Sequence, residues 1–228
     1  MQDLICISHL RWDFVWQRPQ QLLSRLAKQH RIFFVEEPVT DTDIDKPYLE
    51  SYPGRTPGAQ PVTVVRMHYP SSDHYWIGHN DPRTQADYAA LLLDFMEHEE
   101  IHNPILWLYT PMAAPFVEAL QPQFMIYDVM DELSAFKGAP TALKEADRRL
   151  LGQADLVFTG GASLYRARQP YSANIHLFPS GVDIQHFARA DRERFAKPAD
   201  IAQIQSPLLG YFGVIDERMD LDLLAHVA

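Results

Sequence analysis

The chain has 228 residues, of which 46% are hydrophobic and 22% charged, and its formal net charge is -10. This length suffices for one large domain, or for one domain and part of another. The acidic balance argues against a general nucleic-acid surface, which needs a clustered basic face. No apolar run approaches the roughly 20 residues that span a bilayer, and the first three residues lack the basic start of a secretory signal. We therefore expect a cytoplasmic protein that binds no nucleic acid.

The first segment predicts a strand, a loop and a helix. Residues 4–8 form a short apolar run, typical of a strand buried on both faces. Residues 20–29 carry apolar side chains at helical spacing, and Pro19 before them suits a first helical turn. We call residues 9–18 between them the opening loop.

The opening loop is the first candidate for a binding site. It concentrates three large aromatic rings and two arginines, and in an open α/β sheet ligands bind beyond the carboxyl ends of the strands. The alternative is that the rings belong to the core and the arginines pair with nearby acids. The substrate-binding candidates in this loop are His9, Arg11, Trp12 and Arg18.

Strands alternate with helices along the following residues. This alternation implies an α/β fold with a parallel sheet and helices on both faces. The predicted strands are residues 31–36, 62–67, 105–109, 124–127, 155–159 and 175–178. The predicted helices begin at Asp81 or Asp87 and end at Asn103-Pro104, begin at Thr110-Pro111, and cover residues 141–152 and 163–168; residues 38–47, 47–60 and 71–81 are expected to be loops.

The last part of the chain differs from this pattern. Residues 1–183 fit one domain, residues 184–206 read as a linker, and residues 207–228 read as the start of a second domain. A strand at residues 208–212 and a helix from Arg218 or Asp220 make one unit that cannot bury both faces of its strand. We expect a truncated second domain whose residues 208–228 pack on a neighbour, for example in a dimer, or are poorly ordered.

Polar residues at the predicted strand ends should line one crevice if the sheet is parallel. Asp128, Asp131 and Glu132 are the catalytic candidates, because carboxylates accept hydrogen bonds from sugar hydroxyl groups or deprotonate them; helix capping and solvation of the sheet end are the alternative. Gly160 and Gly161 let the backbone approach a ligand or make a tight turn, which we prefer. Glu36-Glu37 also ends a strand, and the further binding candidates are Tyr109, Thr110, Ser180 and Gly181.

The sequence motifs give little support for a metal site or for a common cofactor site. Residues 98–102 match H-E-x-x-H, but a zinc helix should continue past its second histidine, and Asn103-Pro104 follows at once. We interpret these histidines as a polar helix end, expect no metal site, and find neither G-x-G-x-x-G nor a P-loop. The single cysteine, Cys6, lies in a predicted buried strand and is interpreted as a core thiol.

Several segments together resemble a known family. Residues 178–183 (FPSGVD) and 210–218 (GYFGVIDER), joined by a linker, resemble bacterial group 1 (family 4-like) glycosyltransferases of the GT-B fold. The opening loop and residues 127–132 (YDVMDE) resemble a subgroup associated with cell-surface polysaccharide or teichuronic acid synthesis. The resemblance covers a Rossmann-like acceptor-side domain and about the first twenty residues of the donor-side domain.

The resemblance implies transfer of a sugar from a nucleotide-diphosphate sugar to a hydroxyl acceptor, with no resident cofactor. Arg218 would contact the donor pyrophosphate, whereas Val214 and Ser180 depart from the family's usual arginine and asparagine. Most donor contacts would lie in a missing C-terminal domain, so we expect these residues alone to be inactive. In a retaining enzyme the three acids would only position the acceptor.

Two further expectations concern the cellular location and an alternative function. An enzyme of surface polysaccharide synthesis would work in the cytoplasm, with peripheral association at the inner face of the membrane as an option left open. A non-catalytic sugar- or nucleotide-binding module that scaffolds a polysaccharide assembly complex is the alternative function.

Overall fold

The computed structural model describes residues 2–55, 61–70, 81–193, 195–211, 213, 215 and 219–227, with only the backbone described for Pro82 and Asp191. The chain divides into two compact units, Met1–Gly181 and Val182–Ala228. This boundary lies two residues before the expected end of the first domain at residue 183.

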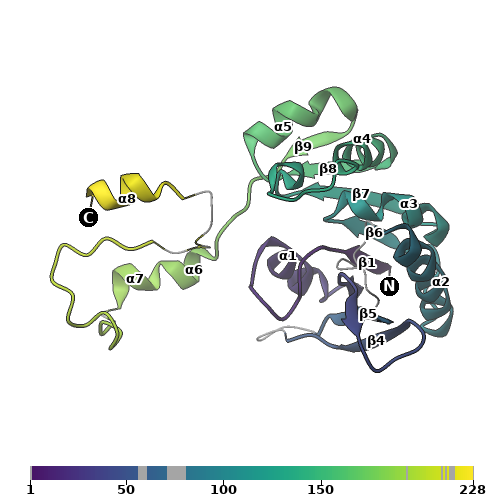
Figure 1. The fold of residues 1–228 in the computed structure, drawn as a ribbon, viewed down its shortest axis with the longest axis horizontal. Coiled ribbons are helices and arrows are strands. Elements are labelled where there is room, and N and C mark those ends of the chain that lie inside the picture. Colours follow the sequence, from purple (N-terminus) through teal and green to yellow (C-terminus); the bar gives the residue numbers. More distant parts are fainter. Residues whose placement is uncertain are drawn as a thin grey trace. The chain divides into compact units, whose positions relative to one another are not determined.

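The first unit is built on one sheet of nine strands from the described residues (Figure 1). The order is β3-β5-β2-β1-β6-β7-β8-β9, and β4 pairs with β5. Eight strands run parallel, and β4 alone is antiparallel to its neighbour. The bounds are β1 Asp3–Ile7, β2 Arg31–Val35, β3 Val39–Asp41, β4 Tyr48–Pro53, β5 Thr63–Pro70, β6 Ile105–Leu108, β7 Phe124–Val129, β8 Leu156–Thr159 and β9 Ile175–Leu177.

Helices cover both faces of this sheet, which confirms the predicted Rossmann-like α/β fold. Tyr88 and Leu92 of α2 pack into the core on one face, and Leu23 of α1 packs with Trp12 into the core on the other. The apolar runs of the strands are buried between these layers, as expected for parallel strands covered on both sides. The helices are α1 Arg18–Leu26, α2 Pro82–His98, η1 Pro111–Ala113, α3 Ala114–Val117, η2 Glu118–Leu120, η3 Leu133–Ala135, α4 Leu143–Gln153, α5 Ala162–Arg168 and η4 Gln169–Tyr171.

The connections place a topological switch at β1. The chain passes from β1 to β2 on one side, and later strands add from β6 outward on the other side. Ile7 is level with Val35 of β2 and with Leu108 of β6, so the three carboxyl ends are adjacent. Ligands in open α/β sheets bind at such a point.

Three expectations about the first unit are wrong. Residues 38–47 were expected to be loop, but Val39–Asp41 forms β3, which pairs with residues 68–70 of β5. Residues 47–60 were expected to be loop, but Tyr48–Pro53 forms the edge strand β4, because β5 offers a free edge and Leu49 and Tyr52 pack against the two cores. Helix α2 ends at His98 rather than at Asn103-Pro104. The chain turns back there so that Ile101, 3% exposed, enters the core. The expected loop at residues 71–81 lies outside the described residues except for Asp81, which caps α2.

The second unit contains short helices in its described part: α6 Ile184–Phe187, α7 Arg189–Arg192 and α8 Leu221–Val227. The expected helix near the end is confirmed, and Asp220 accepts a hydrogen bond from Leu223 N at 2.8 Å. The expected strand at residues 208–212 is wrong for residues 208–211, which form none; Leu209 is 83% exposed there. Without a neighbouring ladder, an apolar run has no partner for its backbone groups. Among the described helices, none is long and apolar enough to cross a membrane.

Candidate functional site

A buried ion pair joins the opening loop to the middle of the sheet. Arg18 begins α1, and its Nε lies 3.1 and 3.0 Å from the two carboxylate oxygens of Asp128. The Arg18 side chain is 6% exposed and that of Asp128 is 0% exposed. Arg18 Nη1 also donates to the Phe178 carbonyl at 2.7 Å. Asp128 therefore neutralises an arginine that ties three segments together.

A second buried carboxylate, Glu36, holds the other half of the opening loop. It follows β2 and is completely buried. One oxygen accepts from Trp12 N at 2.6 Å, and the other accepts from Arg11 Nη1 at 3.2 Å and from Arg66 Nε at 2.8 Å. Gln20 of α1 closes the loop from the opposite side, because its Nε2 donates to the Trp12 carbonyl at 3.1 Å. The sequence placed Glu36 at a strand end but gave no sign of this hub.

The aromatic residues of the opening loop have different roles. Trp12 is 1% exposed, packs edge-on against Phe34 with ring centroids 5.0 Å apart, and donates its indole N–H to the Arg55 carbonyl at 3.1 Å. It belongs to the core, so its assignment as a substrate-binding residue is wrong: no surface is left for a ligand. Phe14, 82% exposed, and Trp16, 39% exposed, are the accessible rings.

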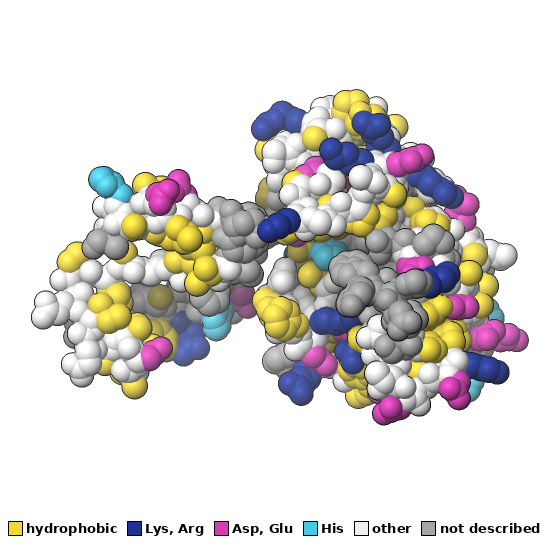
Figure 2. Space-filling view, viewed as in Figure 1, with side chains coloured by type: hydrophobic (Ala, Val, Ile, Leu, Met, Phe, Trp, Pro, Cys, Tyr) yellow, Lys and Arg dark blue, Asp and Glu magenta, His cyan; other side chains and the backbone are white. Residues whose placement is uncertain are grey.

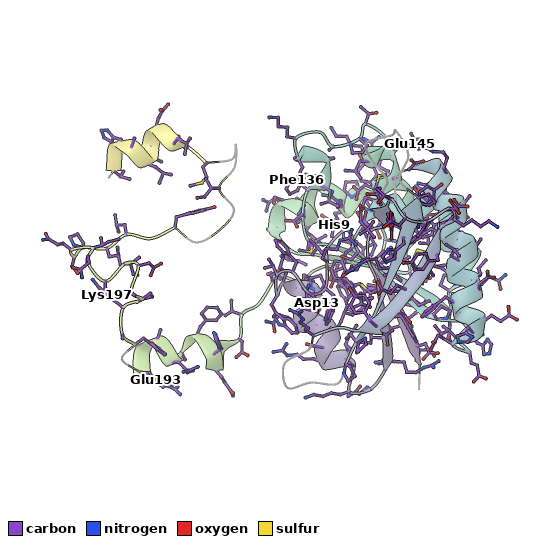
Figure 3. The ribbon with its side chains drawn as sticks, turned by 60° about the horizontal axis from the view of Figure 1, so that its bottom comes forward. His9, Asp13, Phe136, Glu145, Glu193 and Lys197 are labelled. Atoms are coloured by element: carbon purple, nitrogen blue, oxygen red, sulfur yellow. The ribbon has the colours of Figure 1, made fainter. Side chains whose placement is uncertain are left out.

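Two uncharged polar side chains lie at the switch point. Nδ1 of His9, just after β1, has no hydrogen-bond partner among the described residues, whereas the hydroxyl group of Tyr109, just after β6, interacts with the Asp128 carboxylate. Tyr109 N donates to the Ile7 carbonyl at 2.9 Å, which keeps the two strand ends together. Figure 3 labels His9 among the side chains of the first unit.

Burial keeps both groups neutral. The pKa of His9 is lowered from 6.5 by burial, which outweighs the raising effects of the Asp131 carboxylate and of a hydrogen bond with the Tyr109 backbone. Burial, assisted by the charge of Asp128, raises the pKa of Tyr109 far above 10. A neutral imidazole and a phenol can each exchange hydrogen bonds with a hydroxyl group.

The three acids proposed as catalytic residues do not converge. Asp128 faces α1, because β7 extends two residues further than predicted and successive strand residues face opposite sides. Asp131 and Glu132 follow the strand and are exposed. Glu132 accepts from Arg168 at 2.9 and 3.2 Å, and these hydrogen bonds lower its pKa despite partial burial. The prediction that Asp128 binds or deprotonates a sugar hydroxyl is therefore wrong, because its carboxylate is buried against Arg18.

A polar network behind these acids was missed by the sequence. Arg168 of α5, 5% exposed, contacts Glu132 and also approaches Asp147 of α4 with Nε 3.2 Å from Oδ2. Tyr127 donates its hydroxyl to Asp147 at 2.6 Å. Burial and the charge of Asp147 raise the pKa of Tyr127 far above its ordinary value. The spacing of these residues in the sequence does not predict that β7, α4 and α5 meet here.

The remaining candidates have mostly local roles. Thr110 is 1% exposed, and its hydroxyl caps η1 by accepting from Met112 N at 3.3 Å. A Cβ on Gly160 would lie 3.2 Å from the Met130 carbonyl oxygen, so glycine here permits the close approach of the Met130 backbone. Gly161 begins α5 with open space around its Cα, and Ser180 and Gly181 are exposed at the end of the first unit. Arg218 lies outside the described residues.

The H-E-x-x-H segment does not form a metal site. His98 is the last residue of α2, whereas His102 lies beyond it, and both are exposed. Among the residues that the structure describes, no group of three or more His, Cys, Asp or Glu side chains is arranged to hold a metal ion. Cys6 is buried, and burial raises its thiol pKa well above 9.0.

Comparison with solved structures identifies proteins with a similar fold. No family model and no curated protein sequence matches the chain. An E. coli structure described as trehalose-6-phosphate bound with UDP-2-fluoro glucose aligns with a TM-score of 0.54 at 12% identity, over 89% of this chain and 54% of that one. The apo structure of OtsA aligns with a TM-score of 0.54 at 11% identity, over 91% and 55%.

A third match is the α,α-trehalose-phosphate synthase (UDP-forming) of Burkholderia xenovorans in complex with glucose-6-phosphate. It has a TM-score of 0.51 at 13% identity and covers 84% of this chain and 52% of that one. The present chain thus spans about half the length of the structures it matches. At these identities the similarity extends to the fold alone.

Proposed function

We propose that the chain is the acceptor-side half of a glycosyltransferase that moves a sugar from a nucleotide-sugar donor to a hydroxyl acceptor. The observation that carries the proposal is the unpartnered Nδ1 of His9, with the neutral Tyr109 hydroxyl on the neighbouring strand end, at the switch point of a fold shared with trehalose-phosphate synthase. The neighbours' descriptions name a UDP-sugar and a sugar phosphate as bound molecules.

In this proposal the protein orients the acceptor rather than reacting covalently with it. The opening loop is held by Glu36 and Asp128, so His9 stands on a rigid base at the end of β1. Neutral His9 and Asp131 bind the acceptor hydroxyl groups, and the donor is held by further residues, Arg218 among them. Holding two substrates in register supplies about 7–11 kcal/mol of the barrier reduction in favourable cases. The 228 residues alone are therefore expected to have negligible transferase activity.

The test uses the natural protein that contains these residues. Nucleotide sugars are offered with a panel of hydroxyl acceptors, and both nucleoside diphosphate release and the glycosylated product are measured. We expect His9→Gln to lower acceptor-dependent transfer by at least about tenfold, while His102→Gln, an exposed histidine outside the site, leaves it unchanged. Failure of every donor and acceptor pair would refute transferase activity. Sugar binding without transfer would favour the non-catalytic scaffold module.

We also propose, from the resemblance of the opening loop and residues 127–132, a role in cell-surface polysaccharide synthesis, with peripheral association at the membrane. Deletion of the gene should then reduce surface polysaccharide, and an unchanged surface would count against this role. Residues 208–228 are proposed to pack on the rest of the protein, or on a second copy in a dimer. The 83% exposure of Leu209 and the 58% exposure of Tyr211 support such a cover, and light scattering distinguishes the two arrangements.

A further inference from the structure

The arginines nearest the carboxyl edge of the sheet are already engaged in ion pairs and hydrogen bonds within the protein. Arg18 gives its Nε to Asp128 and an Nη to a backbone carbonyl. Arg11 contacts Glu36, and its other donors reach the carbonyls of Glu37 and Pro38. Both guanidinium groups therefore hold the opening loop in place, and their donors to Glu36, Asp128 and the backbone carbonyls are occupied before any ligand arrives.

Arg168, on the other side of the switch point, is held by Glu132 and by Asp147. Arg66 of β5 lies on the same side as Arg11, shares Glu36 with it and donates to the hydroxyl of Tyr52. Figure 2 shows Lys and Arg side chains gathered mainly over the α4 and α5 end of the visible face of the first unit, with acidic side chains beside them. The segments of this unit that the structure leaves undescribed, residues 56–60 and 71–80, contain no lysine or arginine.

A phosphate group at this edge would meet unfavourable electrostatics. Glu37 and Asp131 follow β2 and β7 at the strand ends, and a dianion beside carboxylates is disfavoured unless a cation intervenes. To recruit Arg18, a phosphate would have to displace a carboxylate that is completely buried. The exposed Lys137 lies on the turn after η3, where solvent and salt screen its charge.

The polar side chains of His9 and Tyr109 at the switch point are, by contrast, uncharged. His9 is kept neutral near pH 7 by burial, and Tyr109 keeps its proton. Such groups suit the hydroxyl groups of a sugar, which both donate and accept hydrogen bonds.

From this pairing of charges we infer that the acceptor is an uncharged sugar or glycan end, in contrast to the glucose-6-phosphate named for the Burkholderia structure. The inference rests on the proposed function, because it specifies the acceptor class of the same site. It adds a specificity that the fold similarity does not supply.

The experiment compares each neutral sugar with its own 6-phosphate, using the natural protein. Transfer is measured as kcat/KM, and binding is measured separately by calorimetry in the absence of donor. We expect the neutral sugar to be favoured at least about tenfold in both measurements. Inorganic phosphate should inhibit neither the transfer to the neutral sugar nor its binding. Equal or better use of the 6-phosphate overturns the inference while leaving the transferase proposal intact.

The binding measurement keeps the two proposals separable. If no sugar is transferred, the transferase proposal fails, and the two dissociation constants still decide the acceptor class. Tighter binding of the 6-phosphate, or no binding of either compound at millimolar concentration, overturns the inference.

A charge variant provides a second arm. Glu132→Gln removes one negative charge and leaves an Arg168 donor available, so the preference for the neutral sugar should narrow at least about threefold. Glu145→Gln, on an exposed position of α4, makes the same chemical change away from the strand ends and should leave the preference unaltered. Thermal unfolding establishes that both variants are folded. An unchanged preference in Glu132→Gln contradicts the electrostatic basis of the inference.

Discussion

The Nε of Arg18 lies 3.1 and 3.0 Å from the two carboxylate oxygens of Asp128, although the residues are 110 positions apart in the sequence. This ion pair connects the first residue of α1 to β7, and a further hydrogen bond to the Phe178 carbonyl reaches the end of β9. Both side chains are almost completely buried. Removing one partner leaves a charge without compensation, which usually costs about 3–5 kcal/mol.

We therefore expect Arg18→Ala to lower the free energy of unfolding by about 3–5 kcal/mol in urea titrations. Arg25→Ala, an exposed arginine on the same helix, should change it by less than about 1 kcal/mol. The double variant Arg18→Met with Asp128→Leu should recover part of the loss, because no unpaired charge remains. Equal stabilities of the two single alanine variants would contradict the importance of the pair.

A close backbone approach at Gly54 gives a prediction about the opening loop. A Cβ at Gly54 would lie 2.6 Å from Trp12 Nε1 and 2.8 Å from Val64 Cγ2, so the indole must move. We expect Gly54→Ala to cost about 1–3 kcal/mol of stability, with a change in tryptophan fluorescence. Gly152→Ala is the matched control: it sits in α4 with nothing within 4 Å, and should stabilise by up to about 1 kcal/mol. A Gly54 variant as stable as wild type would refute this packing.

Burial of His9 predicts a dependence of stability on pH. Its pKa is lowered from 6.5, so the unfolded chain binds a proton at a higher pH than the folded chain does. The free energy of unfolding is therefore unaffected by protonation of His9 above pH 6.5, where the imidazole is neutral in both states. It declines as the pH falls from 6.5 toward the pKa of His9 in the folded protein. Urea titrations at pH 7.5, 6.5 and 5.5 should show a smaller decline for His9→Gln than for wild type. His98→Gln, an exposed histidine, should keep the wild-type decline; equal declines in all three proteins would contradict the prediction.

Most strands could be predicted because each is a short apolar run buried on both faces. Strands β3 and β4 could not, since Val39–Asp41 has only three residues and Tyr48–Pro53 alternates poorly and ends in proline. The pairing of both strands depends on β5, which is a tertiary property. The strand predicted at residues 208–211 was wrong for the opposite reason: the residues are mostly apolar, but no described strand pairs with them.

The candidate site was predicted less well, for two physical reasons. The strand containing Asp128 continues to Val129, and strand alternation then turns Asp128 into the interior beneath α1. Charge pairing across long separations, such as Arg11 with Glu36 and Arg168 with Glu132, leaves no periodic trace in a sequence. The position of His9 at the switch point was predictable, because it depends only on where the first strand ends.

The buried Arg168 gives the last prediction. It is 5% exposed, contacts Glu132 and Asp147, and so connects α5 to α4 and to the segment after β7. Arg168→Ala would leave Asp147, 17% exposed at its side chain, facing the Tyr127 hydroxyl without a balancing cation. We expect a loss of about 2–4 kcal/mol in urea titrations.

Two variants separate the ion pairs of Arg168 from general effects on α5. Arg166→Ala changes an exposed arginine two positions away and should alter stability by less than about 0.5 kcal/mol. Tyr127→Phe removes only the hydrogen bond to Asp147, so it should cost about 1 kcal/mol, and less when combined with Arg168→Ala than the sum of the two single changes. Additive losses in this double-mutant cycle would mean that Tyr127, Asp147 and Arg168 do not act as one network, and that the segment carrying Asp131 and Glu132 is held by other contacts.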